Sequence, residues 1–277
     1  MIGTPRRPVI TLLTDYGLRD EFVGVLHGVI ARICPDARII DISHGIARQD
    51  IRAGAAVLAH ALPYMPIGVH VAVVDPTVGH ERRAVALSLR DGRMLVGPDN
   101  GLLWQAAVAS GGVQQAVEIS SSPWCLQPLA ATFHGRDIFA PVAARLASGE
   151  PLERAGEPLD AALVVQLEEP SPRVDADGLL TSVTGIDGFG NVQLAAVAEH
   201  LVKIGAERGE RLSVDAGADE PCSCTVARTF ADVEHGALLL LEDASGKLAL
   251  AVNHGSAATL LQLRTGAELR LQRAGQL

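Results

Sequence analysis

Apolar runs alternate with helical patterns through the first 75 residues, and this alternation constrains the fold more than any other feature of the sequence. Strands and helices are predicted in turn, at residues 9–14, 21–34, 39–42, 50–62 and 69–74. Pro35 and Pro63 end the two helices. Repeats of strand, helix and strand build a parallel sheet that is covered on both faces, so we expect an α/β domain at the N-terminus.

The pattern weakens in the second quarter of the chain and breaks near its middle. A hairpin is predicted from 84–89 and 94–96, turned by Asp91-Gly92, and helices are predicted at 101–109 and 139–147. Four prolines and a group of acidic residues then interrupt the pattern at 149–172. We place a linker there.

Beyond this linker the predicted elements are short strands separated by turn residues. They lie at 179–186, 211–214, 223–228, 238–241, 247–252 and 268–271, with one helix at 197–204. This pattern is typical of a small β-barrel or a β-sandwich. We therefore expect an N-terminal α/β domain with a mostly parallel sheet over residues 1–160 and a C-terminal β-barrel domain over residues 171–277.

Composition and charge exclude several classes of protein. The net charge of −9 provides no basic surface for nucleic acid. No apolar run reaches the roughly 18 residues of a membrane span, and charged residues return too soon after the N-terminus for a signal peptide, so we expect a cytoplasmic protein. The four cysteines form no C-x-x-C pair, which argues against a disulfide framework and a zinc site.

Two aspartates mark the edge of the predicted sheet where a ligand would bind. Asp15 and Asp75 each follow the carboxyl end of a predicted strand, and ligands of open α/β sheets bind beyond these ends. The sequence contains no P-loop, no dinucleotide fingerprint after a strand, no H-E-x-x-H and no G-x-S-x-G. Phosphoryl transfer, hydride transfer, zinc hydrolysis and serine hydrolysis are therefore not expected.

Five polar segments stand between glycines and apolar runs. They are LTDYG at 13–17, VVDPTVGHERR at 73–83, VGPDNGLL at 96–103, TFHGRDIFAP at 132–141 and IDGFGN at 186–191. Together with the tail ASGKLALAVNHGSA at 244–257, they make the chain resemble the S-adenosyl-L-methionine (SAM) hydroxide adenosyltransferases, relatives of fluorinase and chlorinase. The resemblance runs from residue 9 to residue 271. It implies an α/β domain and a β-barrel, and a homotrimer with each site between one subunit's N-terminal domain and a neighbour's C-terminal domain.

The resemblance also implies a water-activating triad of Asp75, Arg82 and His134 in the N-terminal domain. The substrate would be SAM, split by water into adenosine and methionine without a cofactor or metal. A sulfonium is an excellent leaving group, so the reaction needs only a well-placed oxygen nucleophile. His134 is a suitable base, with Asp75 holding its tautomer or the water. Arg82 would stabilise the developing hydroxide charge, although Arg83 beside it leaves room for a one-residue misassignment.

Substrate contacts carry over by the same resemblance, mostly in the C-terminal domain. Asp15 would accept hydrogen bonds from the ribose hydroxyls, and Asp187 would face the methionine ammonium. Asn191 would bond the adenine edge or the ribose region, and Phe189 would stack or pack beside the adenine. Each has a structural alternative; Asp187, for example, is also an ordinary turn residue in a glycine-rich loop.

Three contacts are expected from the tail. Ser245 lies where relatives contact the methionine carboxylate, and Val252 and His254 lie where main-chain groups meet adenine. The sequence also departs from the family, with Thr77 where relatives commonly place glycine. His44 and His80 lie near motifs, and we assign neither a role.

Three other functions remain open from the sequence. A halide-dependent 5'-halo-5'-deoxyadenosine synthase would keep the substrate and change the nucleophile, but halogenating relatives replace the histidine. A non-catalytic adenosine- or SAM-binding protein would need Asp15, Asp187 and Asn191 but not His134. A structural protein without a ligand leaves the clustered polar motifs unexplained.

Overall fold

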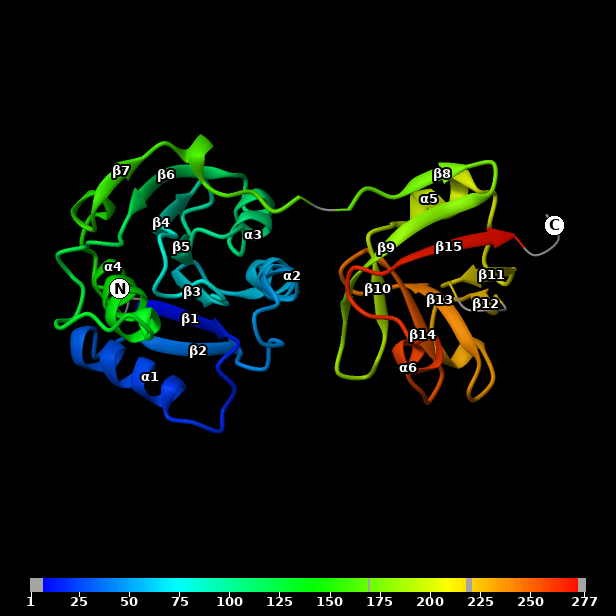
Figure 1. The fold of residues 1–277 in the computed structure, drawn as a ribbon, viewed down its shortest axis with the longest axis horizontal. Helices are drawn as coiled ribbons and strands as arrows, with labels where there is room; N and C mark the ends of the chain where they lie inside the picture. The colour runs from blue at the N-terminus through cyan, green and yellow to red at the C-terminus, as the bar shows by residue number, and fades with distance from the viewer. Residues whose placement is uncertain (1–6, 169, 218–220, 274–277) are drawn as a thin grey trace, which may run out of the picture. The chain divides into compact units, whose positions relative to one another are not determined.

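The computed structural model describes residues 7–168, 170–217 and 221–273. The chain divides into two compact units, residues 1–167 and 168–277 (Figure 1). Each unit has its own sheet and its own hydrophobic core. In the part of the chain that is described, no helix is long and apolar enough to cross a membrane.

A seven-stranded mixed sheet forms the centre of the N-terminal unit. Its strands are β1 (Val9–Thr14), β2 (Arg38–Ser43), β3 (Val69–Val73), β4 (Ala84–Leu89), β5 (Met94–Pro98), β6 (Val113–Glu118) and β7 (Glu157–Leu159). Their order is β2-β1-β3-β5-β4-β6-β7. The pairings among β2, β1, β3 and β5 are parallel, and those of β4 with β5 and β6, and of β6 with β7, are antiparallel.

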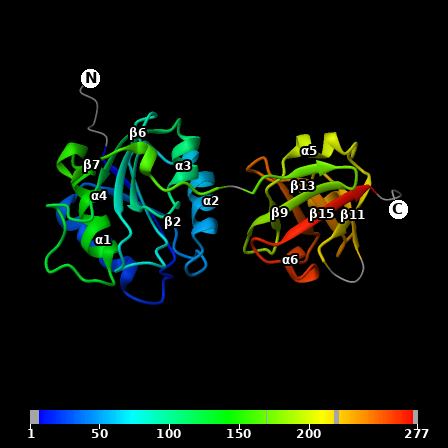
Figure 2. The ribbon, with the colours of Figure 1, turned by 45° about the horizontal axis from the view of Figure 1, so that its top comes forward.

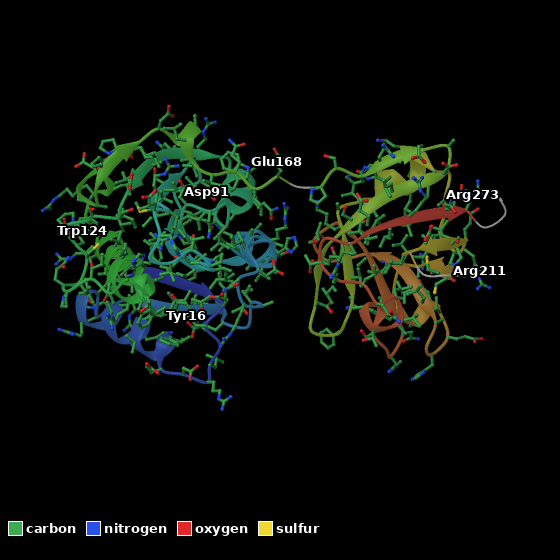
Figure 3. All side chains as sticks on the ribbon, viewed as in Figure 1. Tyr16, Asp91, Trp124, Glu168, Arg211 and Arg273 are labelled. Carbon is green, nitrogen blue, oxygen red and sulfur yellow. The ribbon has the colours of Figure 1, made fainter. Side chains whose placement is uncertain are left out.

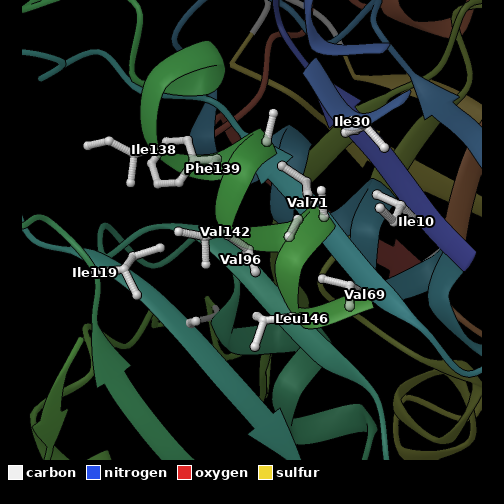
Figure 4. Packing of buried hydrophobic residues seen from close by; sticks show 14 of the residues in the cluster. Ile10, Ile30, Val69, Val71, Val96, Ile119, Ile138, Phe139, Val142 and Leu146 are labelled. Carbon is white, nitrogen blue, oxygen red and sulfur yellow. The ribbon is translucent and has the colours of Figure 1, made fainter. Parts of the chain in front are cut away.

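Helices cover both faces of this sheet. They are α1 (Phe22–Ile33), α2 (Ile51–Ala61), α3 (Trp104–Ala109) and α4 (Ala140–Ala147), and a π-helical turn (Gly135–Phe139) precedes α4. Helices α1 and α4 pack on one face, in a core that includes Ile10, Leu26 and Val142 (Figures 2 and 4). Helices α2 and α3 pack on the other face, around Leu58 and Leu102. Burial on both faces explains why β3 is buried along its whole length.

The C-terminal unit is a closed β-barrel. Its strands are β8 (Arg173–Asp175), β9 (Gly178–Ile186), β10 (Val192–Leu194), β11 (Arg211–Asp215), β12 (Cys222–Val226), β13 (Leu238–Glu242), β14 (Leu248–Val252) and β15 (Glu268–Arg273). The order is β10-β14-β13-β12-β11-β15-β9-β8, and a further pairing of β10 with β9 closes the barrel. Helices α5 (Ala198–Lys203) and α6 (Ala257–Leu260) complete the unit. Alternating side chains, such as Leu212 and Val214 of β11, fill its interior.

The predicted fold class, a parallel-rich α/β unit followed by a β-barrel, is confirmed. The predicted linker at 149–172 differs from the structure, because most of it belongs to the N-terminal unit. Strand β7 pairs with β6, and Val164 is buried in the core with α2 and α3. The proline pattern that suggested a linker includes Pro158 of β7. Proline is tolerated there because an edge strand does not need every N–H for pairing.

Candidate active site

The two strands that end in candidate aspartates are neighbours. Strands β1 and β3 pair in parallel, with Thr14 opposite Val73. The backbone N–H of Asp15 then donates to the carbonyl of Val73 at 3.3 Å. The segments that carry Asp15 and Asp75 therefore leave the same edge of the sheet, at the position where α/β proteins bind ligands. Tyr16, labelled in Figure 3, follows Asp15 in the same loop.

Arg82 joins Asp75 and His134 into one hydrogen-bonded chain. Its Nε donates to Asp75 Oδ2 at 2.9 Å, and its Nη2 donates to the same oxygen. Nη2 also lies 2.8 Å from His134 Nδ1. The side chains of Asp75 and Arg82 are only 5% and 8% exposed, so their charges interact with little screening by water. The three predicted triad residues are in contact.

Of the two roles expected for Asp75, holding the tautomer of His134 or holding the water, the contacts exclude a direct hold on the tautomer. The guanidinium lies between the two side chains. Because a guanidinium only donates, His134 Nδ1 must accept, and the proton of the neutral ring then lies on Nε2. Asp75 Oδ1 faces the Thr77 hydroxyl across a long contact of 3.4 Å, so it can still accept a hydrogen bond from water.

Burial and charge hold the neighbouring groups in defined protonation states. Burial lowers the pKa of His134 below its ordinary value, and the Arg82 guanidinium lowers it further, against the opposing effect of Asp75 and Asp137. His134 is therefore neutral at neutral pH. Burial also raises the pKa of the Tyr16 hydroxyl above its usual range, and the carboxylates of Asp15 and Asp75 add to this effect. Tyr16 remains protonated.

A close packing contact positions the turn that carries His134. His134 precedes the π-helical turn, and π-turns of this kind are frequent at functional sites. The Tyr16 hydroxyl lies so close to Gly135 that a Cβ there would overlap it. The Tyr16 ring also packs on Phe133 and Phe22, with ring centroids 5.9 and 5.8 Å away. The loop after β1 and the turn after residue 134 therefore fix each other.

A concavity of about 620 Å³ lies in the C-terminal unit. Its lining residues are Asp187, Phe189, Asn191, Phe230, Val252, Asn253, His254 and Gly255. Five of these were predicted as substrate contacts from sequence. The chain has only five phenylalanines, and two of them, Phe189 and Phe230, are 83% and 43% exposed at this concavity. Large apolar side chains left in water around a concave surface mark a binding site.

Asp187 organises the loop on one side of this concavity. Its Oδ1 accepts from the backbone N–H groups of Phe189 and Asn191, both at 2.9 Å, and its Oδ2 accepts from Asn191 Nδ2 at 2.7 Å. The turn role considered from the sequence is therefore real. A carboxylate can accept about four hydrogen bonds, so Oδ2 can also receive a ligand cation.

Family models match most of the chain. The N-terminal domain of the SAM hydroxide adenosyltransferases matches residues 10–156, and their C-terminal domain matches residues 181–270. The chain belongs to this family. The family resemblance predicted from the sequence is thus confirmed.

Relatives of known name match this family member over nearly its full length. A protein of Salinispora tropica named (R)-S-adenosyl-L-methionine hydrolase is 50% identical over 264 residues, which is 95% of this chain and 97% of the relative. A protein of the same name from Thermus thermophilus is 37% identical, covering 96% of this chain and 99% of its own. A fluorinase of Nocardia brasiliensis is 30% identical, covering 96% and 97%.

A solved structure agrees with the fold. A crystal structure of an uncharacterised conserved protein from Thermotoga maritima superposes with a TM-score of 0.87 at 36% identity. The match covers 95% of this chain and all of that one.

The structure distinguishes Arg82 from Arg83. Arg83 donates through Nε to buried Asp99 at 2.8 Å and through Nη2 to the Leu163 carbonyl at 2.7 Å. Asp99 in turn accepts from the Val165 N–H at 2.8 Å. Arg83 therefore ties the 163–165 segment to the sheet, while Arg82 contacts the other two triad residues.

Two predicted contacts lie away from the concavity. Ser245 is in the turn before β14, at the opposite end of that strand from Val252, and donates to Asp243 at 2.6 Å. Asp15 belongs to the N-terminal unit, where its Oδ2 accepts from the Gln49 N–H at 2.9 Å. Sequence reasoning missed Phe230, which no motif surrounds; the scarcity of aromatic residues was the available signal.

Proposed function

We propose that this protein hydrolyses SAM to adenosine and L-methionine, by attack of water at C5'. The observation that carries the proposal is the buried chain of Asp75, Arg82 and His134 at the ligand-binding edge of an α/β sheet. Relatives at 37–50% identity carry the name (R)-S-adenosyl-L-methionine hydrolase, which supports the same substrate here.

The hydrogen-bond directions at the triad define a route for the proton. Water donates to Asp75 Oδ1 and accepts from His134 Nε2–H. As the water oxygen bonds to C5', the C5'–S bond breaks and its electron pair neutralises the sulfonium. The proton passes to Asp75 and then to solvent. Arg82 fixes the positions of the carboxylate and the imidazole relative to each other. It also stabilises the negative charge that develops on the attacking oxygen as the water loses its proton.

The candidate contacts fit the parts of the substrate. Asp15 would bond the ribose hydroxyls, and Phe189, with Phe230 added from the structure, would pack on adenine. Main-chain groups of Val252 and His254 would meet the adenine edge. Asp187 would face the ammonium, Asn191 the adenine edge or the ribose, and Ser245 the carboxylate.

The site favours water over halide as the nucleophile. A halide has no proton to lose and would make no use of a proton acceptor. Water, in contrast, needs an acceptor for its proton, and Asp75 Oδ1 provides one. We therefore do not propose halide-dependent synthesis.

The proposal extends to the assembly. We propose a homotrimer in which one subunit's triad and a neighbour's C-terminal concavity act on one substrate. The triad and the concavity belong to different units of the chain, which supports this. The reaction requires no cofactor, and a cytoplasmic location stays a prediction.

The reaction can be tested by isotope labelling. Purified protein is incubated with SAM in water enriched in heavy oxygen, after dialysis against a chelator. We expect adenosine and methionine as products, with the label in the adenosine 5'-hydroxyl. Unlabelled adenosine, or methylthioadenosine as the product, would contradict the mechanism.

A further inference from the structure

A buried histidine that the mechanism does not use supports the loop that carries Asp15. His44 lies just after β2 and is 5% exposed. Its carbonyl accepts from the Gly17 N–H at 2.8 Å, and its Nδ1 lies 2.8 Å from the Thr14 hydroxyl oxygen. Thr14, which is fully buried, is the last residue of β1.

The partners of this histidine fix the direction of each hydrogen bond. His44 Nε2 lies 3.1 Å from Asp41 Oδ1, off the line of a straight hydrogen bond, so this contact is mainly electrostatic. A carboxylate attracts the N–H form of that nitrogen, which leaves Nδ1 as an acceptor for the Thr14 hydroxyl. The same Thr14 oxygen accepts from the Tyr16 N–H at 3.2 Å.

Asp41 is itself held from a second side. His27 Nε2, from α1, lies 2.9 Å from the same Oδ1. Burial raises the pKa of Asp41, but the imidazoles of His27 and His44 more than offset this and hold it below its usual range. The carboxylate is therefore charged and anchors His44.

The segment after β2 meets the Asp15 loop at a second point. The Gln49 N–H donates to Asp15 Oδ2 at 2.9 Å. Gln49 is followed by Asp50, whose side chain caps α2 by accepting from the Ala53 N–H. One segment, residues 44–50, thus fixes both the backbone on either side of Asp15 and the direction of its carboxylate.

We propose that His44 is a positioning residue for the reaction, acting through Asp15 on the ribose of the substrate. The proposal rests on the proposed function in taking Asp15 as the ribose contact. His44 fixes the 14–17 turn by its side chain and its carbonyl. Without the imidazole, the Thr14 hydroxyl loses its acceptor and no longer stays aligned with the Tyr16 N–H, so the Asp15 carboxylate moves relative to Asp75.

The test is a double-mutant cycle between His44 and Asp15. Since Asp15 would bind the ribose in ground and transition states alike, we expect His44→Ala to raise KM for SAM about tenfold with a smaller change in kcat. In an Asp15→Asn background the same change should alter KM less than twofold, because the group that His44 positions is already lost. His44→Asn, whose amide oxygen can accept from Thr14, should restore part of the affinity.

Two further variants separate positioning from folding. Thr14→Val removes the hydroxyl at nearly constant shape and should reproduce the effect on KM if His44→Ala fails to fold. His70 is the matched control, because its Nδ1 also lies 2.9 Å from a threonine hydroxyl, that of Thr11, in the same sheet. His70→Asn should lower the melting temperature and leave KM unchanged.

Several outcomes overturn the assignment. One is an equal rise in KM when His44→Ala is made in the wild type and in the Asp15→Asn variant. Another is a rise of the same size in the His70→Asn variant. Binding of adenosine, measured by calorimetry, keeps the test independent of turnover. If the wild type binds adenosine but does not hydrolyse SAM, the proposed function fails while the coupling is still measured in Kd. A wild type that does not bind adenosine would remove the role of Asp15 and overturn the inference too.

Discussion

Arg82 lies between Asp75 and His134, which excludes one of the two expected roles of Asp75, a direct hold on the His134 tautomer, and leaves the other, contact with the water. The sequence places an aspartate, an arginine and a histidine in three motifs, but it does not give the order in which they touch. That order decides which oxygen or nitrogen is free for water. In the proposed mechanism, Asp75 therefore accepts the proton and His134 supplies an orienting hydrogen bond, whereas the sequence alone suggested His134 as the base.

The role of His134 predicts a pH profile. Because Arg82 donates to Nδ1, protonation of the ring would bring two N–H groups face to face and break the triad. Burial and Arg82 hold the pKa of His134 below 6.5, so kcat/KM should be level above that pH and fall as pH drops through the lowered pKa. His134→Ala removes a hydrogen-bond donor to the attacking oxygen and should lose about 10²- to 10³-fold in kcat, with little change in substrate affinity. Loss of affinity alone would assign His134 to binding.

Buried His70 predicts a second, purely thermodynamic pH effect. Burial, and then Arg93, lower its pKa from 6.5 to about 4, against a small opposing effect of Asp91. The folded state keeps the ring neutral, so the contribution of His70 is the same at all pH values above about 6.5. Below that pH, His70 binds a proton in the unfolded chain, whereas it stays neutral in the folded protein down to about pH 4. Stability should fall by about 1.4 kcal/mol per pH unit, roughly 3 kcal/mol by pH 4.

Urea unfolding at pH 7, 5.5 and 4.5 measures this effect, with His70→Asn as the comparison. The difference in unfolding free energy between the two proteins should shrink as the pH falls. A constant difference would show that His70 is not held neutral.

At the scale of elements, the turn before α4 depends on the absence of one side chain. Gly135→Ala would place a Cβ against the Tyr16 hydroxyl. We expect a large loss of kcat from displacement of His134, partly recovered in the double variant with Tyr16→Phe. Gly28→Ala, at an exposed position of α1 where a Cβ meets nothing within 4 Å, is the control and should leave activity unchanged. Steady-state kinetics of the wild type, the two single variants at the turn, the double variant and the Gly28→Ala control tests this, and additive effects of the two changes at the turn would contradict it.

The elements that sequence reasoning found are those with a strong period. Strands β1, β3, β9 and β14 were predicted within one or two residues, because their apolar runs are bounded by turn residues. Strand β10 was missed, since three residues are too few to show alternation. In strand β6 the first residue, Val113, is followed by the exposed pair Gln114 and Gln115, which hides the alternating pattern. The π-turn before α4 has no sequence period of its own.

At the scale of the whole molecule, the candidate site also combines residues that were predicted from the sequence with residues that were not. Residues in motifs, such as Asp75 and Asn191, were found by resemblance, and the structure groups them by unit. Phe230 lines the concavity together with residues from 187–191 and 252–255, and His44 lies within hydrogen-bond distance of Thr14. These contacts join residues far apart in sequence, so no local pattern records them. The proposed trimer is likewise a property of surfaces, and it needs its own experiment.

Mixing inactive subunits tests the shared site. His134→Ala should lose turnover and Asp187→Ala should lose substrate affinity, since the ammonium loses its charged partner. If one substrate contacts two subunits, mixed trimers contain some sites with both residues intact, and part of the activity should return. The measurement is activity after subunit exchange, with exchange verified by mass. No recovery, or an active monomer in light scattering, would rule out the arrangement.

The pairing of β10 with β9 has a consequence for how the protein behaves at high concentration. Closure leaves β8 at the margin of the barrel sheet, and a strand of three residues is a poor template for the addition of another chain. The open sheet of the N-terminal unit has two margins, β2 and β7. One carries the charged residues Arg38 and Asp41, and the other is three residues long with Pro158 at its centre. The proline that resembled a linker signal thus blocks the addition of a further strand.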